Sequence, residues 1–267
     1  TLLHWLFAAK GDIPIPRVVL DLPVTAADTS LVIPAAHGGR FTQRVFQVYP
    51  FDASLLYPSP YSPVLGGDAI EIELIGDFFD DCYAAAKRYS QDSGAAMVPP
   101  FDHEDIVEGQ ASVALEIERQ LKGELPDMVV MPVGGGGLAS GVTSYFAGPG
   151  APDFRFVEPL GAPSLKTSLT EGRRMRMPQI DGFVDGAAVA EIGALPFELL
   201  GGFPADHVIL SPEGRLCQTM LEMLNLEGIV LEPAGALSID ALRSFRNVIA
   251  GKTVVLVVSG GNFDFER

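Results

Sequence analysis

From Gly66 onward, segments with the hydrophobic pattern of a strand alternate along the chain with segments that have the hydrophobic pattern of a helix. Residues 70–75 alternate at every second position, and residues 128–133 form a short continuous apolar run; both patterns are typical of strands, the second of a buried strand. Residues 105–121 place apolar side chains three and four positions apart, which predicts an amphipathic helix. Strands and helices that alternate in this way predict a three-layer α/β architecture with an open, mostly parallel sheet.

Further segments repeat these two patterns. Strands are expected at residues 95–98, 154–157 and 252–258, and helices near residues 77–86, 162–170 and 213–224. Another helix begins at Pro233, because proline is tolerated in the first helical turn.

Residues 1–65 do not share this organisation. They are rich in Pro, Tyr and Phe and show no stable period, so no fold is assigned to them. We expect residues 66–105 to form part of a small domain and residues 106–267 a larger one. The chain has 267 residues, 48% of them hydrophobic, and can therefore bury a large core.

Charge and composition narrow the classes of partner. A net charge of −16 argues against nucleic acid and anionic membrane surfaces, and no apolar run reaches the roughly 18–20 residues of a membrane span. Cys82 and Cys217 are expected in the core and suggest no disulfide framework. The four histidines lack metal-ligand spacing, so no metal site is expected. A reducing cytoplasm fits this composition best.

Four consecutive glycines, Gly134 to Gly137, follow the apolar run at 128–133 and precede a helix-compatible segment. Only glycine lets backbone N–H groups converge without interference from side chains. At a helix N-terminus such a loop binds an anion, most readily a phosphate. A flexible linker is the alternative, but linkers are rarely clamped between a buried strand and a helix. The loop therefore predicts a phosphorylated cofactor or substrate.

Two cofactor classes compete for this loop. The glycines at Gly134 and Gly136, followed by Ala139, satisfy the loose dinucleotide fingerprint. Glu158 closes a later apolar stretch, where an acid would contact a ribose hydroxyl of NAD. This pattern alone is weak because glycine is abundant in the chain.

Several longer motifs favour a different cofactor. In chain order they are GDFFDDCYAAA (76–86), PFDHEDIVEGQ (100–110), MPVGGGGL (131–138), VEPLGAPS (157–164), FVDGAAV (183–189), EGIVLEPAGAL (227–237) and VVSGGN (257–262). Together they resemble the threonine dehydratase (threonine ammonia-lyase) family, enzymes of fold type II, the tryptophan synthase β-like fold, that use pyridoxal phosphate (PLP). The resemblance covers residues from about 66 to 267.

The resemblance implies roles for particular residues. The cofactor phosphate would be bound by backbone amides of Gly134, Gly135, Gly136, Gly137 and Leu138. Ser259 would hydrogen-bond the pyridine nitrogen, and a hydroxyl partner leaves that nitrogen largely unprotonated, which favours β-elimination. Gly186 would let the backbone pass close to the cofactor ring. A plain strand-end turn at Ser259 and an ordinary turn at Gly186 are the alternatives.

The resemblance also assigns roles to residues outside this set. Glu158 becomes a strand-end residue near the site, and Glu232 lies near the cofactor or caps the helix at Pro233. Ser164 stands where some relatives that bind a metal have an acid, which again argues against a metal.

The implied reaction is PLP-dependent β-elimination of L-threonine or L-serine to a 2-oxo acid and ammonia. It belongs to amino-acid metabolism, in the biosynthesis of isoleucine, and the family suggests a cytoplasmic homo-oligomer. Three alternatives stay open: an inactive PLP- or phosphate-binding homologue, a serine racemase or β-replacement relative, and an NAD-dependent enzyme.

One part of the family pattern is missing. The family binds PLP through a lysine in a Ser-Phe-Lys-x-Arg-Gly motif and contacts substrate through Ser-Ala-Gly-Asn-His; neither motif occurs here, so the catalytic residue is unknown. The five lysines are Lys10, Lys87, Lys122, Lys166 and Lys252. The last four are expected on the solvated surface, and Lys10 lacks the flanking motif.

Residues 1–65 occupy the place of that lysine motif. They are a divergent replacement, a remnant without the lysine segment, or the product of an altered reading frame. The family's C-terminal regulatory domain is also absent from the sequence, so control by an end-product amino acid is expected to be lost.

Overall fold

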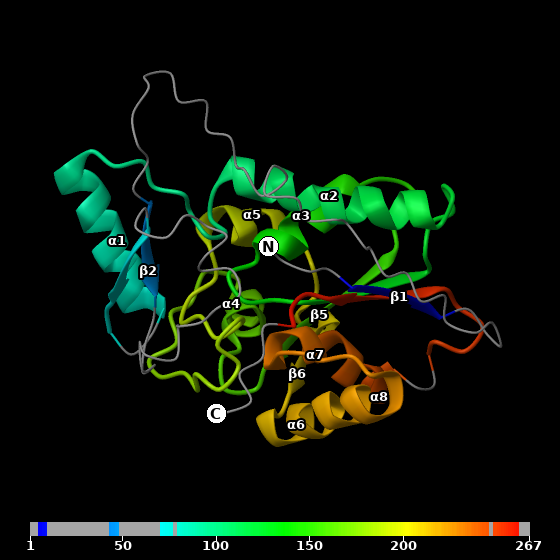
Figure 1. Ribbon diagram of the computed structural model, residues 1–267. Coiled ribbons are helices and arrows are strands. Elements are labelled where there is room, and N and C mark those ends of the chain that lie inside the picture. The colour runs from blue at the N-terminus through cyan, green and yellow to red at the C-terminus, as the bar shows by residue number, and fades with distance from the viewer. Residues whose placement is uncertain (1–4, 10–42, 48–69, 77–78, 246–247, 262–267) are drawn as a thin grey trace. The chain divides into compact units, whose positions relative to one another are not determined.

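A computed structural model describes residues 5–9, 43–47, 70–76, 79–245 and 248–261 (Figure 1). Contacts between Cα atoms divide the chain into two compact units, one with residues 21–98 and one with residues 2–20 and 99–267. Lys10 and Asn262 lie outside the described residues.

The smaller unit contains a parallel pair of strands and one helix. β2 (Gln43–Gln47) pairs with β3 (Ile70–Leu74), and α1 (Phe79–Ser93) buries Cys82 and two alanines on one face. The strand predicted at 95–98 is wrong: these residues form no strand, and Val98 is 58% exposed. The apolar run is only four residues long and leads into Pro99 and Pro100, which have no N–H group to donate to a neighbouring strand.

The larger unit is built on a five-stranded sheet of order β1-β7-β4-β5-β6. In that order the strands are β1 (Trp5–Ala9), β7 (Val254–Val258), β4 (Met128–Pro132), β5 (Asp153–Pro159) and β6 (Val208–Ser211). All neighbours pair in parallel except β1, which runs antiparallel to β7. The predicted open, mostly parallel α/β sheet is thereby confirmed.

Both faces of this sheet are buried, and the side chains of one strand divide between them. On β4, Val129 and Met131 join one hydrophobic cluster, and Met128 and Val130 join the other. This division explains why the sequence of a parallel central strand is a continuous apolar run.

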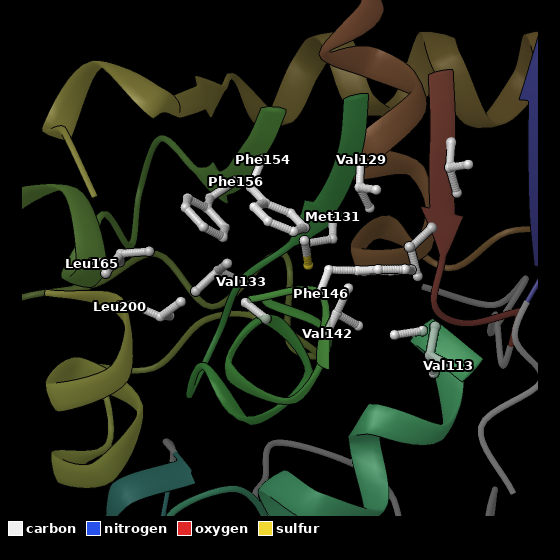
Figure 2. Packing of buried hydrophobic residues seen from close by; sticks show 14 of the residues in the cluster. Val113, Val129, Met131, Val133, Val142, Phe146, Phe154, Phe156, Leu165 and Leu200 are labelled. Carbon is white, nitrogen blue, oxygen red and sulfur yellow. The ribbon is translucent and has the colours of Figure 1, made fainter. Parts of the chain in front are cut away.

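Helices cover each face of the sheet. The first cluster includes residues of α2 (Glu104–Gln120), α3 (Gly137–Tyr145), α4 (Ser164–Glu171) and α5 (Ala194–Leu200), and Figure 2 shows its packing. The second includes residues of α6 (Glu213–Glu222), α7 (Pro233–Asp240) and α8 (Leu242–Phe245). A 3₁₀ turn, η3 (Ala205–His207), precedes β6, and a π-helical turn, η4 (Met223–Glu227), continues α6. The result is the three-layer arrangement expected from the sequence.

Local signals account for several helix boundaries. The Nδ1 atom of His103 accepts a hydrogen bond from the amide of Asp105 at the start of α2, and Pro233 begins α7 as predicted. The prediction for Cys217 is wrong, because this residue lies on the exposed side of the amphipathic helix α6. Within the described ranges no helix is both long and apolar enough to cross a membrane.

Candidate functional site

The glycine loop and Ser259 lie at the same edge of the sheet. β4 and β7 are parallel neighbours, so their carboxyl ends lie side by side. Their register pairs Val130 with Leu256, and β4 ends at Pro132 and β7 at Val258. The glycine loop and Ser259 therefore follow the same ends of two neighbouring strands.

The first three glycines of the loop are packed too tightly for any side chain. A Cβ atom at Gly134 would lie 2.9 Å from the Cα atom of Ala187, and one at Gly135 would overlap the ring of Phe101. Gly136 has a φ of +94°, and its Cβ would lie 2.7 Å from that of Pro196. Only glycine fits these positions, because the loop lies against the backbone of Ala187 and against the side chains of Phe101 and Pro196.

The backbone amides of this loop are free to bind an anion. Gly136 is the N-cap of α3, and no side chain caps that helix end. In the described part of the chain, no acceptor is hydrogen-bonded to the amides of Gly134 to Leu138. The unpaired first-turn amides and the positive end of the helix dipole together favour a bound negative group. This loop fits the phosphate of PLP.

Two nearby helices begin differently, because a carboxylate of the chain already occupies each N-terminus. Glu158 accepts hydrogen bonds from the first-turn amides of α4, at 2.6 Å from Leu165 and 2.9 Å from Lys166. Asp102 accepts from the first two amides of α5, at 3.0 Å from Ala194 and 2.9 Å from Leu195. Of these three helices, α3 alone keeps its N-terminus open.

Glu158 is fully buried at the end of β5. Burial raises the pKa of its carboxyl to about 7, against the opposing effect of hydrogen bonds from the Lys166 and Leu165 amides and the Ser164 hydroxyl. Because its oxygens are bound to α4, this carboxylate is not available to a ribose. The dinucleotide alternative therefore lacks the acidic residue it requires.

Gly186 and Ser259 are brought together by the start of α7. A Cβ atom at Gly186 would lie 2.9 Å from that of Ala234 and 3.3 Å from the Oε1 atom of Glu232. The amide of Glu232 donates to the carbonyl of Gly260, 3.2 Å away. The Glu232 side chain makes no hydrogen bond that caps α7. Since Ala187 also contacts Gly134, the loop at 134–138, Gly186 and the end of β7 form one continuous surface.

Ser259 is well placed for a ligand at this surface. Its side chain is 9% exposed, and within the described residues its hydroxyl has no hydrogen-bond partner. A hydroxyl can donate to or accept from a ring nitrogen, so Ser259 can meet the pyridine ring of PLP.

The described lysines of the larger unit lie elsewhere. Lys166 is half-buried rather than solvated, contrary to the prediction, and its Nζ donates to the carbonyl of Val208 at the start of β6, 2.7 Å away. Lys252 precedes β7, and Lys122 precedes β4, both at the opposite edge of the sheet.

Lys87 belongs to α1 of the smaller unit and is exposed, as expected. In the described ranges, no group of three or more His, Cys, Asp or Glu side chains is arranged to hold a metal ion.

The sequence did not reveal two residues that shape the loop. Phe101 packs on Gly135 and Gly137, and Asp102 binds the start of α5. Both lie in the motif at 100–110, but no role followed from that motif. Gly193 with Pro196 three residues later is a weak signal for the start of α5.

The chain is similar in sequence to known enzymes. Residues 64–260 match the family model described as pyridoxal-phosphate dependent enzyme. The biosynthetic L-threonine dehydratase IlvA of Halalkalibacterium halodurans is 43% identical over 204 residues, which cover 76% of this chain and 48% of that protein. The same enzyme of Staphylococcus saprophyticus is 42% identical over 207 residues, 76% of this chain and 49% of that protein. The chain thus spans about half the length of the curated relatives it matches.

Among solved structures, the processed form of threonine deaminase isoform 2 from Solanum lycopersicum matches with a TM-score of 0.72 and 30% identity. The match covers 84% of this chain and 63% of that one.

Proposed function

Since the chain belongs to the pyridoxal-phosphate dependent enzyme family, we propose that it is an ammonia-lyase that converts L-threonine or L-serine to a 2-oxo acid and ammonia. The observation that carries this proposal is the open N-terminus of α3 behind four glycines, beside an unpartnered Ser259. When bound, PLP supplies an electron sink for the substrate's Cα atom. Similarity to threonine dehydratases supports this reaction over others on the same fold.

The chain's own residues would bind and orient the cofactor. Amides of Gly134 to Leu138 hold the phosphate. Gly186 lets the backbone pass close to the ring, and a side chain does not fit there because its Cβ would meet Ala234. Ser259 is a neutral partner for the ring nitrogen. A neutral partner leaves that nitrogen largely unprotonated, which favours β-elimination over reactions that need a stronger electron sink.

Further parts of the proposal concern organisation. We expect a small domain that includes residues 66–105, a large PLP-binding domain at 106–267, and a homo-oligomer that acts on a hydroxy-amino acid in the cytoplasm. The similarity to biosynthetic threonine dehydratases supports the hydroxy-amino-acid substrate. Light scattering coupled to size-exclusion chromatography measures the oligomeric state.

The reaction also needs an amine to remove the substrate's α-proton. Of the five lysines, Lys10 is the one whose position is not described. The test is formation of a 2-oxo acid from L-threonine or L-serine with added PLP, compared between the wild type and Gly136→Ala, in which a side chain would distort the phosphate loop. We expect PLP-dependent product in the wild type and its loss in Gly136→Ala; product lost in Lys10→Ala but kept in Lys252→Ala would identify Lys10 as the amine.

A second function is supported by the positions of the lysines. In the described part of the larger unit, no lysine amine lies at the carboxyl edge of β4 and β7. The alternative is therefore a chain that binds PLP without catalysing elimination. Retention of PLP with no 2-oxo acid from either substrate would establish this alternative and refute the ammonia-lyase.

A further inference from the structure

Two walls enclose the glycine loop, and they come from distant parts of the chain. On one side, the ring of Phe101 covers Gly135, and the Phe101 backbone lies 3.1 Å from where a Cβ atom of Gly137 would be. On the other side, a Cβ at Gly136 would lie 2.7 Å from Pro196 and 3.2 Å from Ile192. The conformation of the loop backbone therefore depends on how far Phe101 lies from Ile192 and Pro196.

One carboxylate ties the walls together. Asp102 follows Phe101 directly, and its two oxygens accept hydrogen bonds from the amides of Ala194 and Leu195 in the opposite wall. Gly193, which directly precedes Ala194, donates its amide to the carbonyl of Gly135, 3.1 Å away. The Asp102 carboxylate is thus connected to the backbone of the glycine loop through Ala194 and Gly193.

Asp102 also closes a competing anion site. A carboxylate at the N-terminus of α5 satisfies the amides there and neutralises the positive end of that helix. Of the two helix starts that flank Gly136, those of α3 and α5, the start of α3 then keeps its amides open for a phosphate.

From this geometry we propose that Asp102 is a positioning residue that holds the glycine loop in the form that binds the cofactor phosphate. This inference rests on the proposed PLP site. Asp102 does not touch the cofactor in this account; it acts through Phe101, Gly193 and α5.

The test compares two ligands that differ only in the phosphate. Deoxypyridoxine phosphate and deoxypyridoxine both lack the aldehyde of PLP, so neither reacts with surface lysines. In Asp102→Asn, one oxygen that accepts an amide hydrogen is replaced by an NH₂ group; in Asp102→Ala, both acceptors are lost. The matched control is Asp127→Asn, because Asp127 also accepts a backbone amide, that of Thr253 at 2.6 Å, but at the opposite edge of the sheet.

We expect Asp102→Ala to weaken binding of the phosphate ligand about tenfold and Asp102→Asn to weaken it less. Binding of deoxypyridoxine should change less than about twofold in both variants, and Asp127→Asn should leave both ligands within about twofold. Unchanged phosphate affinity in the Asp102 variants would overturn the proposal. An equal loss for both ligands would also overturn it, because that result indicates a general structural role. Asp102→Asn keeps the comparison possible where Asp102→Ala does not fold.

A second readout separates this inference from the proposed function. In ligand-free protein labelled with ¹⁵N-glycine, Asp102→Asn should shift the amide resonances of Gly134 to Gly137, and Asp127→Asn should not. If the wild type binds neither ligand, the proposed function fails, and these resonances alone decide: a shift supports the positioning role and unchanged resonances refute it.

Discussion

Gly136 cannot be replaced by a residue with a side chain for two reasons, its backbone conformation and its close packing. Its φ of +94° is one that residues with a side chain rarely adopt, and the Cβ of Pro196 is 2.7 Å from where a new Cβ would lie. Gly202 has neither constraint, since nothing lies within 4 Å of a Cβ built there. The two glycines therefore form a matched pair for substitution by alanine.

We predict that Gly136→Ala lowers the free energy of unfolding by about 1–3 kcal/mol, the usual cost of a residue held in an unfavourable backbone region. It should also abolish binding of the phosphate ligand. Gly202→Ala should stay within about 0.5 kcal/mol of the wild type and bind normally. Denaturant titration and ligand titration measure both effects. Wild-type behaviour in Gly136→Ala would show that the loop adapts to a side chain.

Glu158 predicts a pH dependence of stability. Burial raises its pKa to about 7 in the folded protein, above its ordinary value of 4.5, so the folded state holds the proton more tightly than the unfolded state. The resulting stabilisation is fully present below pH 4.5 and is lost as the pH rises to about 7, a loss of about 3 kcal/mol.

Glu158→Gln removes this titration, although one of its two acceptors for the α4 amides becomes a donor. The free energy of unfolding, measured by denaturant titration from pH 4.5 to 7, should fall less steeply in Glu158→Gln than in the wild type. Parallel curves for the two proteins would mean that Glu158 does not titrate in this window.

At the residue scale, the sequence could predict the glycine loop but not its walls. Four adjacent glycines between a strand and a helix predict an anion site, because their amides can converge at a helix N-terminus. In the structure these amides are open. Asp102 and Ala194 are 92 positions apart, so their hydrogen bond follows from the tertiary fold and from no local pattern. The structure likewise shows which of several helix ends already has a carboxylate partner.

Between elements, Asp240 joins α7 to β6 and α6. Its fully buried carboxylate accepts hydrogen bonds from the Ser211 hydroxyl at 2.7 Å and from the Arg215 guanidinium at 2.6 Å. Burial raises the pKa of this carboxyl, but the hydrogen bonds and the charge of Arg215 outweigh burial, and the pKa lies below its usual value. The ionised carboxylate therefore depends on these partners.

We predict that Arg215→Met costs about 3 kcal/mol in the free energy of unfolding, because it removes the closest charged partner of a buried carboxylate and leaves it the hydroxyls of Ser211 and Thr219 and the more distant Arg243. Asp240→Asn in the same chain should recover part of this loss, because it removes the charge. A double-mutant cycle by denaturant titration measures the coupling. Additive effects of the two substitutions would show that the pair is not coupled.

At the element scale, the clarity of the pattern decided what the sequence could predict. β4 and β7 each have a continuous apolar run, α2 has clear helical periodicity and α7 has a helix-starting proline, and all four were predicted. β1, β6 and α5 were not predicted, although β1 is as long as β4 and β7: β1 belongs to the segment without a stable period, and β6 and α5 are too short to show much periodicity. The wrong strand at 95–98 has the same cause: four apolar residues resemble a strand, and only the fold shows that no partner pairs with them.

At the scale of the molecule, the order and direction of the strands bring the residues of the site together. Residues 134–138, 186 and 259 are far apart in sequence and meet because β4 and β7 are parallel neighbours and the turn at 186–187 contacts both the loop and the start of α7. Ligand sites at the carboxyl ends of strands are a general property of open α/β sheets. The lysines of the larger unit that the structure describes lie elsewhere.

The most direct test of this account is incubation of the purified chain with PLP, with and without borohydride, followed by absorbance and peptide mass spectrometry. We predict one equivalent of bound PLP per chain, displaced by deoxypyridoxine phosphate and absent in Gly136→Ala. We also predict no stoichiometric borohydride adduct on Lys87, Lys122, Lys166 or Lys252. Failure to retain PLP, or one full adduct on any of these four lysines, would contradict the site described above.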